Sequence, residues 1–294
     1  EDGILTDKDF PDMPEDNEGR FFYLLDKIVN REGIGDILAN GTHWAAKEIG
    51  NGADAYAHNN IKKHEQLPLK LSMLNPIFLM YCTGEKLNIT QIEGQFPQAP
   101  FPKKEHREKF VKDWFQVPDD KFKQYFLDWE PRGENSNPYY PTPQIACDIV
   151  DWQERMHYID DALGMCAGLS SFHLKPPYHI HNIPKFLSAG AGFDMDEDKL
   201  SRAAKRYRTL VRAINIRRGL RREDEKPPAD HWKKRFPELE KELLDTYYNY
   251  KGWNEEGIPT EASLHELGLD FVRDDFIQRG ILAAGEDPLS KETN

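Results

Sequence analysis

The sequence predicts a mainly α-helical protein with little strand. Several long segments repeat apolar residues at the spacing of one helical face, candidate strands are few, and no internal repeat is present. The chain has 294 residues, of which 38% are hydrophobic and 12% aromatic. It is therefore expected to be globular, and it is long enough to bury one large core or two smaller ones.

The first two expected helices lie near the N-terminus. Apolar residues recur at helical spacing through residues 21–31, and Gly33 and Gly35 would end that helix. Asp36 can cap a second helix over residues 37–49, because its carboxylate can accept a hydrogen bond from a backbone N–H of the first turn.

The middle of the chain carries weaker signals. Residues 67–80 form an apolar run that two prolines interrupt, so one long helix is not expected there. Residues 94–105 and 131–143 are rich in proline and polar residues and are predicted to form long ordered loops. Aromatic residues between these loops indicate two short helices: Phe110, Trp114, Phe115, Phe122, Phe126 and Trp129.

The C-terminal part is again strongly helical. Residues 196–218 place a row of apolar residues on one face, and residues 237–250 form another helix that Gly252 would stop. A short helix near residues 261–267 follows Thr260, a candidate cap.

Charge and cysteine content limit the function classes. The net charge of −12 disfavours a general nucleic-acid role, because binding phosphates needs an excess of Lys and Arg. No stretch approaches 18 apolar residues, and no signal-peptide pattern is present, so we expect no membrane span. Three cysteines make no disulfide framework and fit a reducing cytoplasm. Cys82 and Cys147 are expected to be small buried residues.

The hexapeptide D-A-L-G-M-C, Asp161 to Cys166, is the most informative local pattern. A helical stretch over residues 148–160 would deliver it as a helix C-terminus. It places a candidate thiolate five residues after a carboxylate, and Gly164 between them lets the backbone approach a ligand closely. Taken alone, a cysteine beside a helix-ending glycine is more often a small core residue.

Three further segments accompany this motif in a fixed order: R-E-G-I-G-D-I-L-A-N-G at 31–41, N-I-R-R-G-L-R-R-E-D at 215–224, and D-T-Y-Y-N-Y-K-G-W-N-E-E-G-I-P-T at 245–260. Together the four segments resemble the C-terminal half of the tungsten-pterin aldehyde:ferredoxin oxidoreductase family. The resemblance covers residues 1–66 and 144–282. It implies the helical C-terminal domains of that family, with little strand.

The resemblance also implies a domain division. Residues 1–66 would be the end of the family's middle helical domain, and residues 67–294 its C-terminal helical domain. G-I-L-T at residues 3–6 resembles a family segment that follows a pterin-binding stretch and a helix. We therefore expect the first half of the protein to lie upstream of Glu1. Segment 67–143 diverges from the aldehyde enzymes, and it resembles the branch of the family that acts on benzoyl-CoA.

Two cofactors follow from the resemblance, a tungsten-bis-pterin (tungstopterin) and a 4Fe-4S cluster. A cluster usually needs four thiolates, and this chain cannot supply them alone. In the family three ligands lie upstream of the matched region, and the fourth corresponds to Cys166, the expected metal ligand. Asp161 corresponds to a carboxylate that hydrogen-bonds the pterin. Met165 offers its backbone to the pterin, and Leu163 and Gly164 belong to the same cofactor-binding stretch.

The resemblance therefore implies an iron–sulfur oxidoreductase subunit that reduces the aromatic ring of benzoyl-CoA to a cyclic dienoyl-CoA in anaerobic aromatic degradation. Its catalytic residues are unknown and are expected mostly upstream of Glu1. The expected partners are an iron–sulfur electron-transfer subunit, an acyl-CoA substrate and a larger multisubunit complex, without nucleic acid or a membrane span. Two alternatives stay open: a tungsten aldehyde:ferredoxin oxidoreductase that converts aldehydes to carboxylates, and a cofactor-free helical assembly module.

Two charged segments allow more than one interpretation. Residues 202–222 hold nine basic side chains and no acidic one. They form either a solvated helix face paired with the acidic helix 238–245, or an anion site for pterin phosphates, CoA phosphates or an acidic redox partner. His173, His179 and His181 lie in a proline-rich stretch and are expected in surface or structural roles, with a substrate or subunit contact as the alternative.

Overall fold

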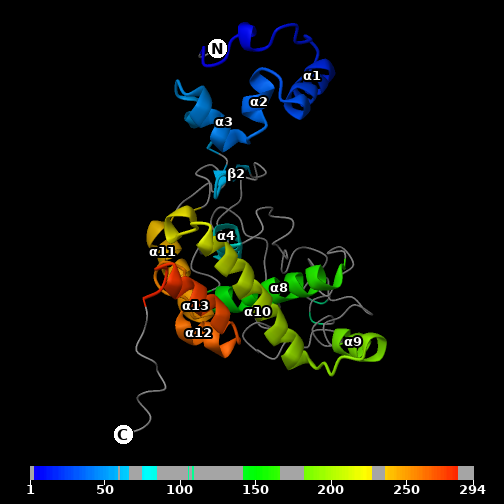
Figure 1. Ribbon diagram of the computed structural model, residues 1–294, viewed down its shortest axis with the longest axis vertical. Helices are drawn as coiled ribbons and strands as arrows, with labels where there is room; N and C mark the ends of the chain where they lie inside the picture. Colours follow the sequence, from blue (N-terminus) through cyan, green and yellow to red (C-terminus); the bar gives the residue numbers. More distant parts are fainter. Residues whose placement is uncertain are drawn as a thin grey trace. The chain divides into compact units, whose positions relative to one another are not determined.

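The computed structural model describes residues 3–58, 60–65, 75–84, 105, 108, 142–165, 182–226 and 236–283. The described elements are helices and one two-stranded sheet, so the prediction of a mainly α-helical protein is confirmed (Figure 1). The chain divides into two compact units, Glu1–Leu71 with Lys226–Lys233 and Ser72–Glu225 with Lys234–Asn294. The predicted domain boundary between residues 66 and 67 stays a prediction.

The first unit contains short helices and a hairpin. Its elements are η1 (Asp7–Asp9), α1 (Asn17–Asn30), α2 (Ile34–Leu38), α3 (Thr42–Ile49), η2 (Ala53–Ala55), β1 (Asn60–Ile61) and β2 (His64–Glu65). Asp16 caps α1 by accepting a hydrogen bond from the backbone N–H of Gly19 at 2.7 Å. A Cβ at Gly35 would lie 2.2 Å from the carbonyl oxygen of Lys27, so only glycine lets α2 pack this closely on α1.

One predicted helix of this unit is wrong. The expected helix over residues 37–49 is two helices, because the chain turns at Gly41 with a φ of 88° before α3 begins. Asp36 lies inside the first turn of α2 and does not cap a helix; its carboxylate pairs with the Arg31 guanidinium at 2.9 Å.

The second unit contains the longer helices. Its described elements are α4 (Asn75–Thr83), α8 (Pro143–Leu163), α9 (Ile183–Ala191), α10 (Glu197–Arg217), η5 (Arg222–Asp224), α11 (Pro237–Lys251), α12 (Glu261–Glu266) and α13 (Asp270–Gln278). The helices predicted at 196–218, 237–250 and 261–267 are confirmed, and the Thr260 side chain caps α12 as predicted. The predicted aromatic helices around residues 110–129 lie outside the described residues.

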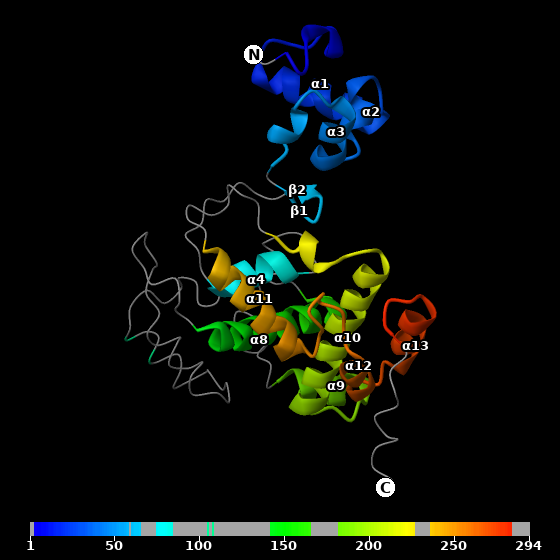
Figure 2. The same cartoon turned by 90° about the vertical axis from the view of Figure 1, so that its left-hand side faces the viewer.

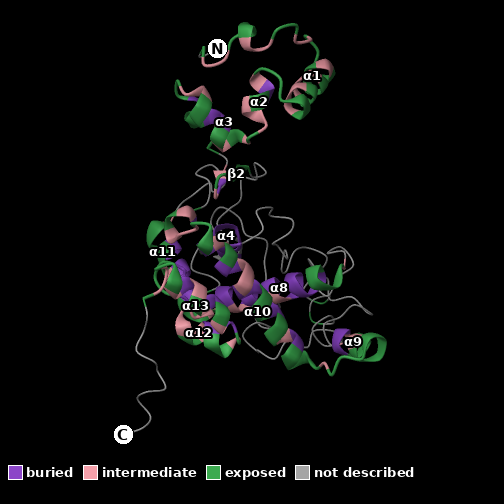
Figure 3. Cartoon of the chain, viewed as in Figure 1, coloured by how far each residue is buried: buried purple, intermediate pink, exposed green. Residues whose placement is uncertain are grey.

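Helix α8 is the central element of the second unit. It packs against α4, α10 and α11, and its side chains are buried around most of its circumference (Figures 2 and 3). A helix covered on all sides by other helices can present polar groups only to partners inside the core. A second cluster joins the end of α10 to α12 and α13: Ala213, Ile216, Ile258, Leu264, Leu269, Val272 and Phe276. None of the described helices is both long and apolar enough to span a membrane.

Candidate functional site

The C-terminal end of α8 carries the predicted cofactor-binding residues. The helix is buried up to Asp160, whereas Asp161, Leu163 and Gly164 are exposed. Gly164 ends the helix in the left-handed conformation, with a φ of 66°, and the backbone N–H of Met165 donates to the Asp160 carbonyl oxygen at 2.8 Å. The sequence therefore brings four predicted site residues onto one exposed turn.

Charge at this turn fits a ligand that donates hydrogen bonds. Asp161 lies in the last turn of α8, where the negative end of the helix dipole disfavours a carboxylate. Its position is therefore unfavourable for the helix itself, and N–H donors of a bound ring would offset that cost. A pterin presents such donors, so the residues of this turn fit the predicted cofactor.

Other predicted site residues lie outside the described residues. These are the expected cluster ligand Cys166 and the three histidines at 173, 179 and 181. The assignments of all the site residues stay predictions. Among the described residues, no three His, Cys, Asp or Glu side chains gather as a metal site.

The two other cysteines are buried, as predicted. Cys82 and Cys147 have no exposed surface, and neither forms a disulfide among the described residues. Burial raises the pKa of the Cys147 thiol to about 12, so it stays protonated and unreactive at neutral pH.

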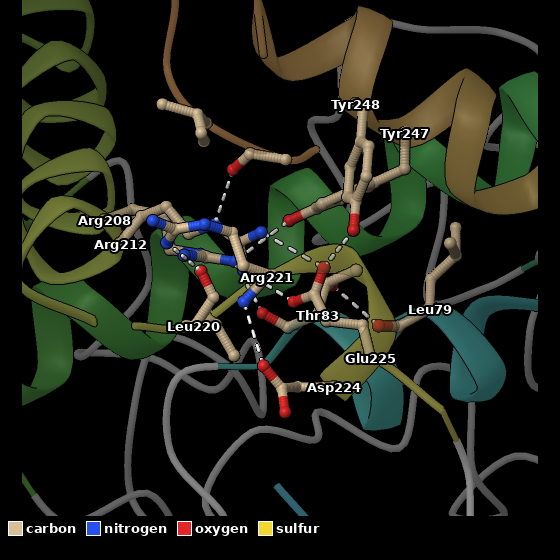
Figure 4. A network of polar contacts seen from close by, with 12 residues as sticks. Leu79, Thr83, Arg208, Arg212, Leu220, Arg221, Asp224, Glu225, Tyr247 and Tyr248 are labelled. Atoms are coloured by element: carbon tan, nitrogen blue, oxygen red, sulfur yellow. Dashed lines mark hydrogen bonds and ion pairs between the residues drawn. The ribbon is translucent and has the colours of Figure 1, made fainter. Parts of the chain in front are cut away.

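The basic helix α10 directs two of its arginines into the core (Figure 4). The Arg208 guanidinium donates to the Glu154 carboxylate at 2.9 Å and to the Thr83 carbonyl oxygen at 3.0 Å. The Tyr247 hydroxyl donates to the same carboxylate at 2.6 Å. Because Arg208 is already paired inside the core, it is unavailable to a phosphate group from outside.

Arg212 lies one turn further along α10 and has its own partner set. Its guanidinium makes a bidentate pair with Glu225 at 2.5 and 3.1 Å and donates to the Gly257 carbonyl oxygen at 2.9 Å. The Tyr248 hydroxyl also donates to Glu225. Arg208 and Arg212 both lie over the indole of Trp253, at 5.2 and 4.4 Å from the ring centroid.

A third buried set joins α8 to α11. The Lys251 ammonium lies 2.7 Å from both Asp151 and Glu154, and Arg155 pairs with Asp151 at 3.0 Å. Burial by itself would raise the pKa of Asp151, but Lys251 and Arg155 outweigh it and lower the pKa to about 2. Burial would likewise lower the pKa of Lys251, and the two carboxylates outweigh it and raise that pKa.

These contacts decide part of what the basic segment 202–222 does. Its two buried arginines support the fold, and Arg222 pairs with Asp245 of the acidic helix at 2.6 Å. An anion site on this segment would therefore have to use its remaining side chains. The sequence did not identify Glu154 and Glu225 as the partners of Arg208 and Arg212. The available signal was that these two arginines lie beside the apolar face of a long helix.

The first unit contains an apolar cavity of about 470 Å³. Thr42, Ala45 and Ala46 of α3 line one wall, and Tyr56 lines another. The volume suits a small ligand. Its lining includes no charged side chain, so the cavity does not specify a ligand class.

Comparisons with known proteins agree on one family. The family model described as aldehyde ferredoxin oxidoreductase, domains 2 and 3, matches residues 1–269. The tungsten-containing aldehyde ferredoxin oxidoreductase of Pyrococcus horikoshii is 26% identical over 264 residues, which are 84% of this chain and 36% of that protein. The Pyrococcus furiosus enzyme of the same name is 24% identical over 285 residues, 92% of this chain and 40% of that protein.

A solved structure is much more similar. It is described as the active site complex BamBC of benzoyl coenzyme A reductase in complex with 1,5 dienoyl-CoA. Its matched chain is 77% identical, with a TM-score of 0.89, over 96% of this chain and 44% of that chain. This chain thus spans less than half the length of each of these relatives.

Proposed function

Because this chain belongs to the aldehyde ferredoxin oxidoreductase family, we propose that it is part of a tungsten-pterin iron–sulfur oxidoreductase. The reaction is reduction of the aromatic ring of benzoyl-CoA to a cyclic dienoyl-CoA, as in anaerobic aromatic degradation. One observation carries the choice within the family. The identity is 77% to the chain of a benzoyl-CoA reductase complex, against 24–26% to the aldehyde enzymes.

The exposed turn at the end of α8 is the part of this chain that we assign to the cofactors. When bound, the tungsten-bis-pterin would supply low-potential electrons for ring reduction, with the 4Fe-4S cluster as their relay. Asp161 would accept hydrogen bonds from pterin N–H groups, and Met165 would contribute its backbone. Cys166 would supply one thiolate to the cluster. Leu163 and Gly164 would belong to the same cofactor-binding stretch.

Buried ion pairs of the second unit hold α8, and with it the exposed turn, in a fixed orientation. Asp151 and Glu154 are tied to α10 and α11 by Arg208 and Lys251, so the helix cannot rotate without breaking several buried ion pairs. The direction of the turn at Asp161 is thereby set by the interior of the second unit.

We include a separate iron–sulfur electron-transfer subunit, a larger complex and a cytoplasmic location in the proposal. The solved relative is itself described as a complex bound to a dienoyl-CoA, which supports an acyl-CoA substrate and assembly with another subunit. The three cysteines of this chain and the absence of a disulfide framework fit a reducing compartment.

An anaerobic assay of the complete protein tests the activity. We expect oxidation of the cyclic dienoyl-CoA, coupled to an artificial electron acceptor, and no comparable rate with benzaldehyde or other aldehydes. Aldehyde oxidation without dienoyl-CoA turnover would establish the alternative activity. Protein lacking tungsten, iron and visible cluster absorption would favour the cofactor-free assembly module.

The Cys166→Ala variant tests the cluster assignment. We expect a lost or degraded iron–sulfur EPR signal with most of the helical content retained, because the other ligands lie elsewhere. Cys147→Ala is the matched control, since that thiol is buried and protonated. An unchanged iron content and EPR spectrum in Cys166→Ala would remove this residue from the site.

A further inference from the structure

Helix α10 carries an apolar row on its outer side. Ala203, Tyr207, Leu210 and Ile214 follow one another at intervals of four, three and four residues, the spacing that keeps side chains on one face of a helix. Tyr207 and Ile214 are 38% and 44% exposed, Ala203 is exposed, and Leu210 is half-buried. We call these four residues the α10 seam. Exposed residues recur along the length of this helix (Figure 3).

The inner face of α10 explains why the seam lies outside. Arg208 and Arg212 point into the core, where buried carboxylates pair with both guanidinium groups. These two ion pairs fix which face of the helix is turned inward. Rotating the seam into the core would leave Glu154 and Glu225 buried without their arginines. The polar core therefore holds the apolar seam at the surface of the second unit.

Unpaired cations flank the seam on both sides. With 3.6 residues per turn, Arg206 lies on one side of the seam and Arg218 on the other. Both are exposed, and neither forms an ion pair in the part of the chain that the structure describes. Two further arginines are already engaged: Arg202 donates to a backbone carbonyl oxygen of α12, and Arg217 lies 3.9 Å from a carboxylate of α13. An apolar strip between two unpaired cations fits a partner helix whose apolar side chains have carboxylates beside them.

The seam also lies against the helix that ends in the exposed turn. The Tyr207 ring packs edge-on against Tyr158 of α8, with the ring centroids 4.8 Å apart. The Arg155 guanidinium of α8 donates to the Ser201 hydroxyl of α10 at 2.7 Å. Tyr158 precedes Gly164 by six residues, about 9 Å of helix rise. A protein bound at the seam would therefore lie beside α8, the helix whose C-terminal turn we assign to the cofactors.

We propose that the α10 seam is the docking surface for the iron–sulfur electron-transfer subunit. The subunit would present a helix whose apolar side chains pack on the seam and whose carboxylates pair with Arg206 and Arg218. This inference rests on the proposed function, which requires a separate source of electrons, and it assigns a surface of this chain to that subunit.

Charge disfavours a second copy of this chain as the occupant. Residues 202–222 hold nine basic side chains and no acidic one, so two seams packed on each other would bring like charges together. The chain as a whole carries a net charge of −12, so this basic segment is a local exception on an acidic protein. An acidic partner would be repelled by most of the surface and attracted here, which gives the contact a defined place.

Binding of the electron-transfer subunit to the complete protein tests the inference. Ile214→Asp puts a charge into the seam, and the double variant Arg206→Glu/Arg218→Glu reverses both flanking charges. We expect each of them to raise the Kd for the subunit about tenfold or more, as for loss of an interface hot spot. Wild-type binding should weaken with salt, whereas binding by the charge-reversed variant should not.

The controls make the same changes outside the seam. Phe271→Asp on α13 replaces a 59% exposed ring, and Lys185→Glu on α9 reverses an exposed charge. Both should leave the Kd unchanged. Oxidation of the dienoyl-CoA with an artificial electron acceptor bypasses the subunit, so its rate should be the same in every variant.

Three results would overturn the inference. The first is an unchanged Kd in both seam variants. The second is a lower free energy of unfolding together with a lost artificial-acceptor rate, which would show that another segment of the same polypeptide covers the seam. The third is a change from dimer to monomer with subunit binding intact, which would show that a second copy covers it.

Failure of the proposed function would be a separate result. A complete protein that oxidises aldehydes and leaves the dienoyl-CoA unchanged would overturn the activity. A raised Kd in the seam variants of that protein would still support the docking surface, because the Kd is measured without turnover.

Discussion

Two tryptophans of this chain each have two cationic side chains over the indole ring, one in the core and one at the surface. Trp253 is buried, and its cations, Arg208 and Arg212, are both paired with buried carboxylates. Trp44 is half exposed, and its two lysines have no carboxylate partner among the described residues. Burial makes the carboxylate partners of the two arginines necessary, because an unpaired charge inside the core is costly, whereas the exposed lysines are solvated.

The buried pair of Arg212 and Glu225 should have the largest effect on stability. Arg212→Ala leaves the Glu225 carboxylate buried without its guanidinium, and removing one member of a buried pair costs about 3–5 kcal/mol. Denaturant unfolding of the complete protein measures this loss. Arg217→Ala is the matched control on the same helix, because that guanidinium is exposed and 3.9 Å from Asp275. There we expect about 0–1 kcal/mol. Equal losses in the two variants would contradict the assignment of Arg212 to the core.

The Lys251 set should give a pH-dependent effect. The pKa of Asp151 is lowered from 3.8 to about 2, so its stabilising contribution is present above about pH 4 and is lost as the pH falls toward 2. A shift of this size corresponds to about 2 kcal/mol. Lys251→Met should remove most of that contribution at neutral pH.

The free energy of unfolding, measured between about pH 5 and pH 2, checks this prediction. The difference between wild type and Lys251→Met should shrink as the pH falls, because protonated carboxyl groups no longer need the lysine. A difference that stays constant over this range would mean that the ion pairs contribute nothing measurable.

Asp161 should affect cofactor retention more than folding. It is exposed on the last turn of α8, so Asp161→Ala should leave the free energy of unfolding nearly unchanged. The lost hydrogen bond to a charged acceptor is worth roughly 1.5–3 kcal/mol, equivalent to about tenfold or more in pterin retention. Tungsten content per protein measures it. Asp198→Ala, an exposed carboxylate at the start of α10, is the control. Full tungsten occupancy in Asp161→Ala would remove this residue from the site.

The positions of the helices were largely predictable from the sequence, whereas the ion-pair partners of their buried side chains were not. The periodicity of residues 196–218 identified α10 almost to its ends. The same pattern could not show that Arg208 and Arg212 are buried, because their carboxylate partners are 54 and 13 residues away. Pairing at a distance in the sequence depends on the tertiary fold, which local patterns do not encode.

Helix α1 shows that local patterns also fail to predict burial. Its apolar spacing correctly predicted a helix, yet none of its residues is buried among the described residues, and Phe21 and Val29 are 61% and 71% exposed. Periodicity therefore predicts a helix and its apolar face without showing what covers that face. The exposed turn at the end of α8 was predictable as a helix end because Gly164 is a strong C-terminal signal.

The smallest stability effect should come from Trp44, and it completes the comparison of the two tryptophans. Trp44→Leu removes a half-exposed ring whose cations are not part of a buried network, so we expect a change in unfolding free energy within about 0.5 kcal/mol. Trp253→Leu makes the same substitution where the ring is buried against two paired arginines, and should cost at least about 2 kcal/mol. Denaturant unfolding of both variants under one condition checks the pair. A loss in Trp44→Leu as large as that in Trp253→Leu would show that this exposed ring stabilises the first unit, contrary to the prediction.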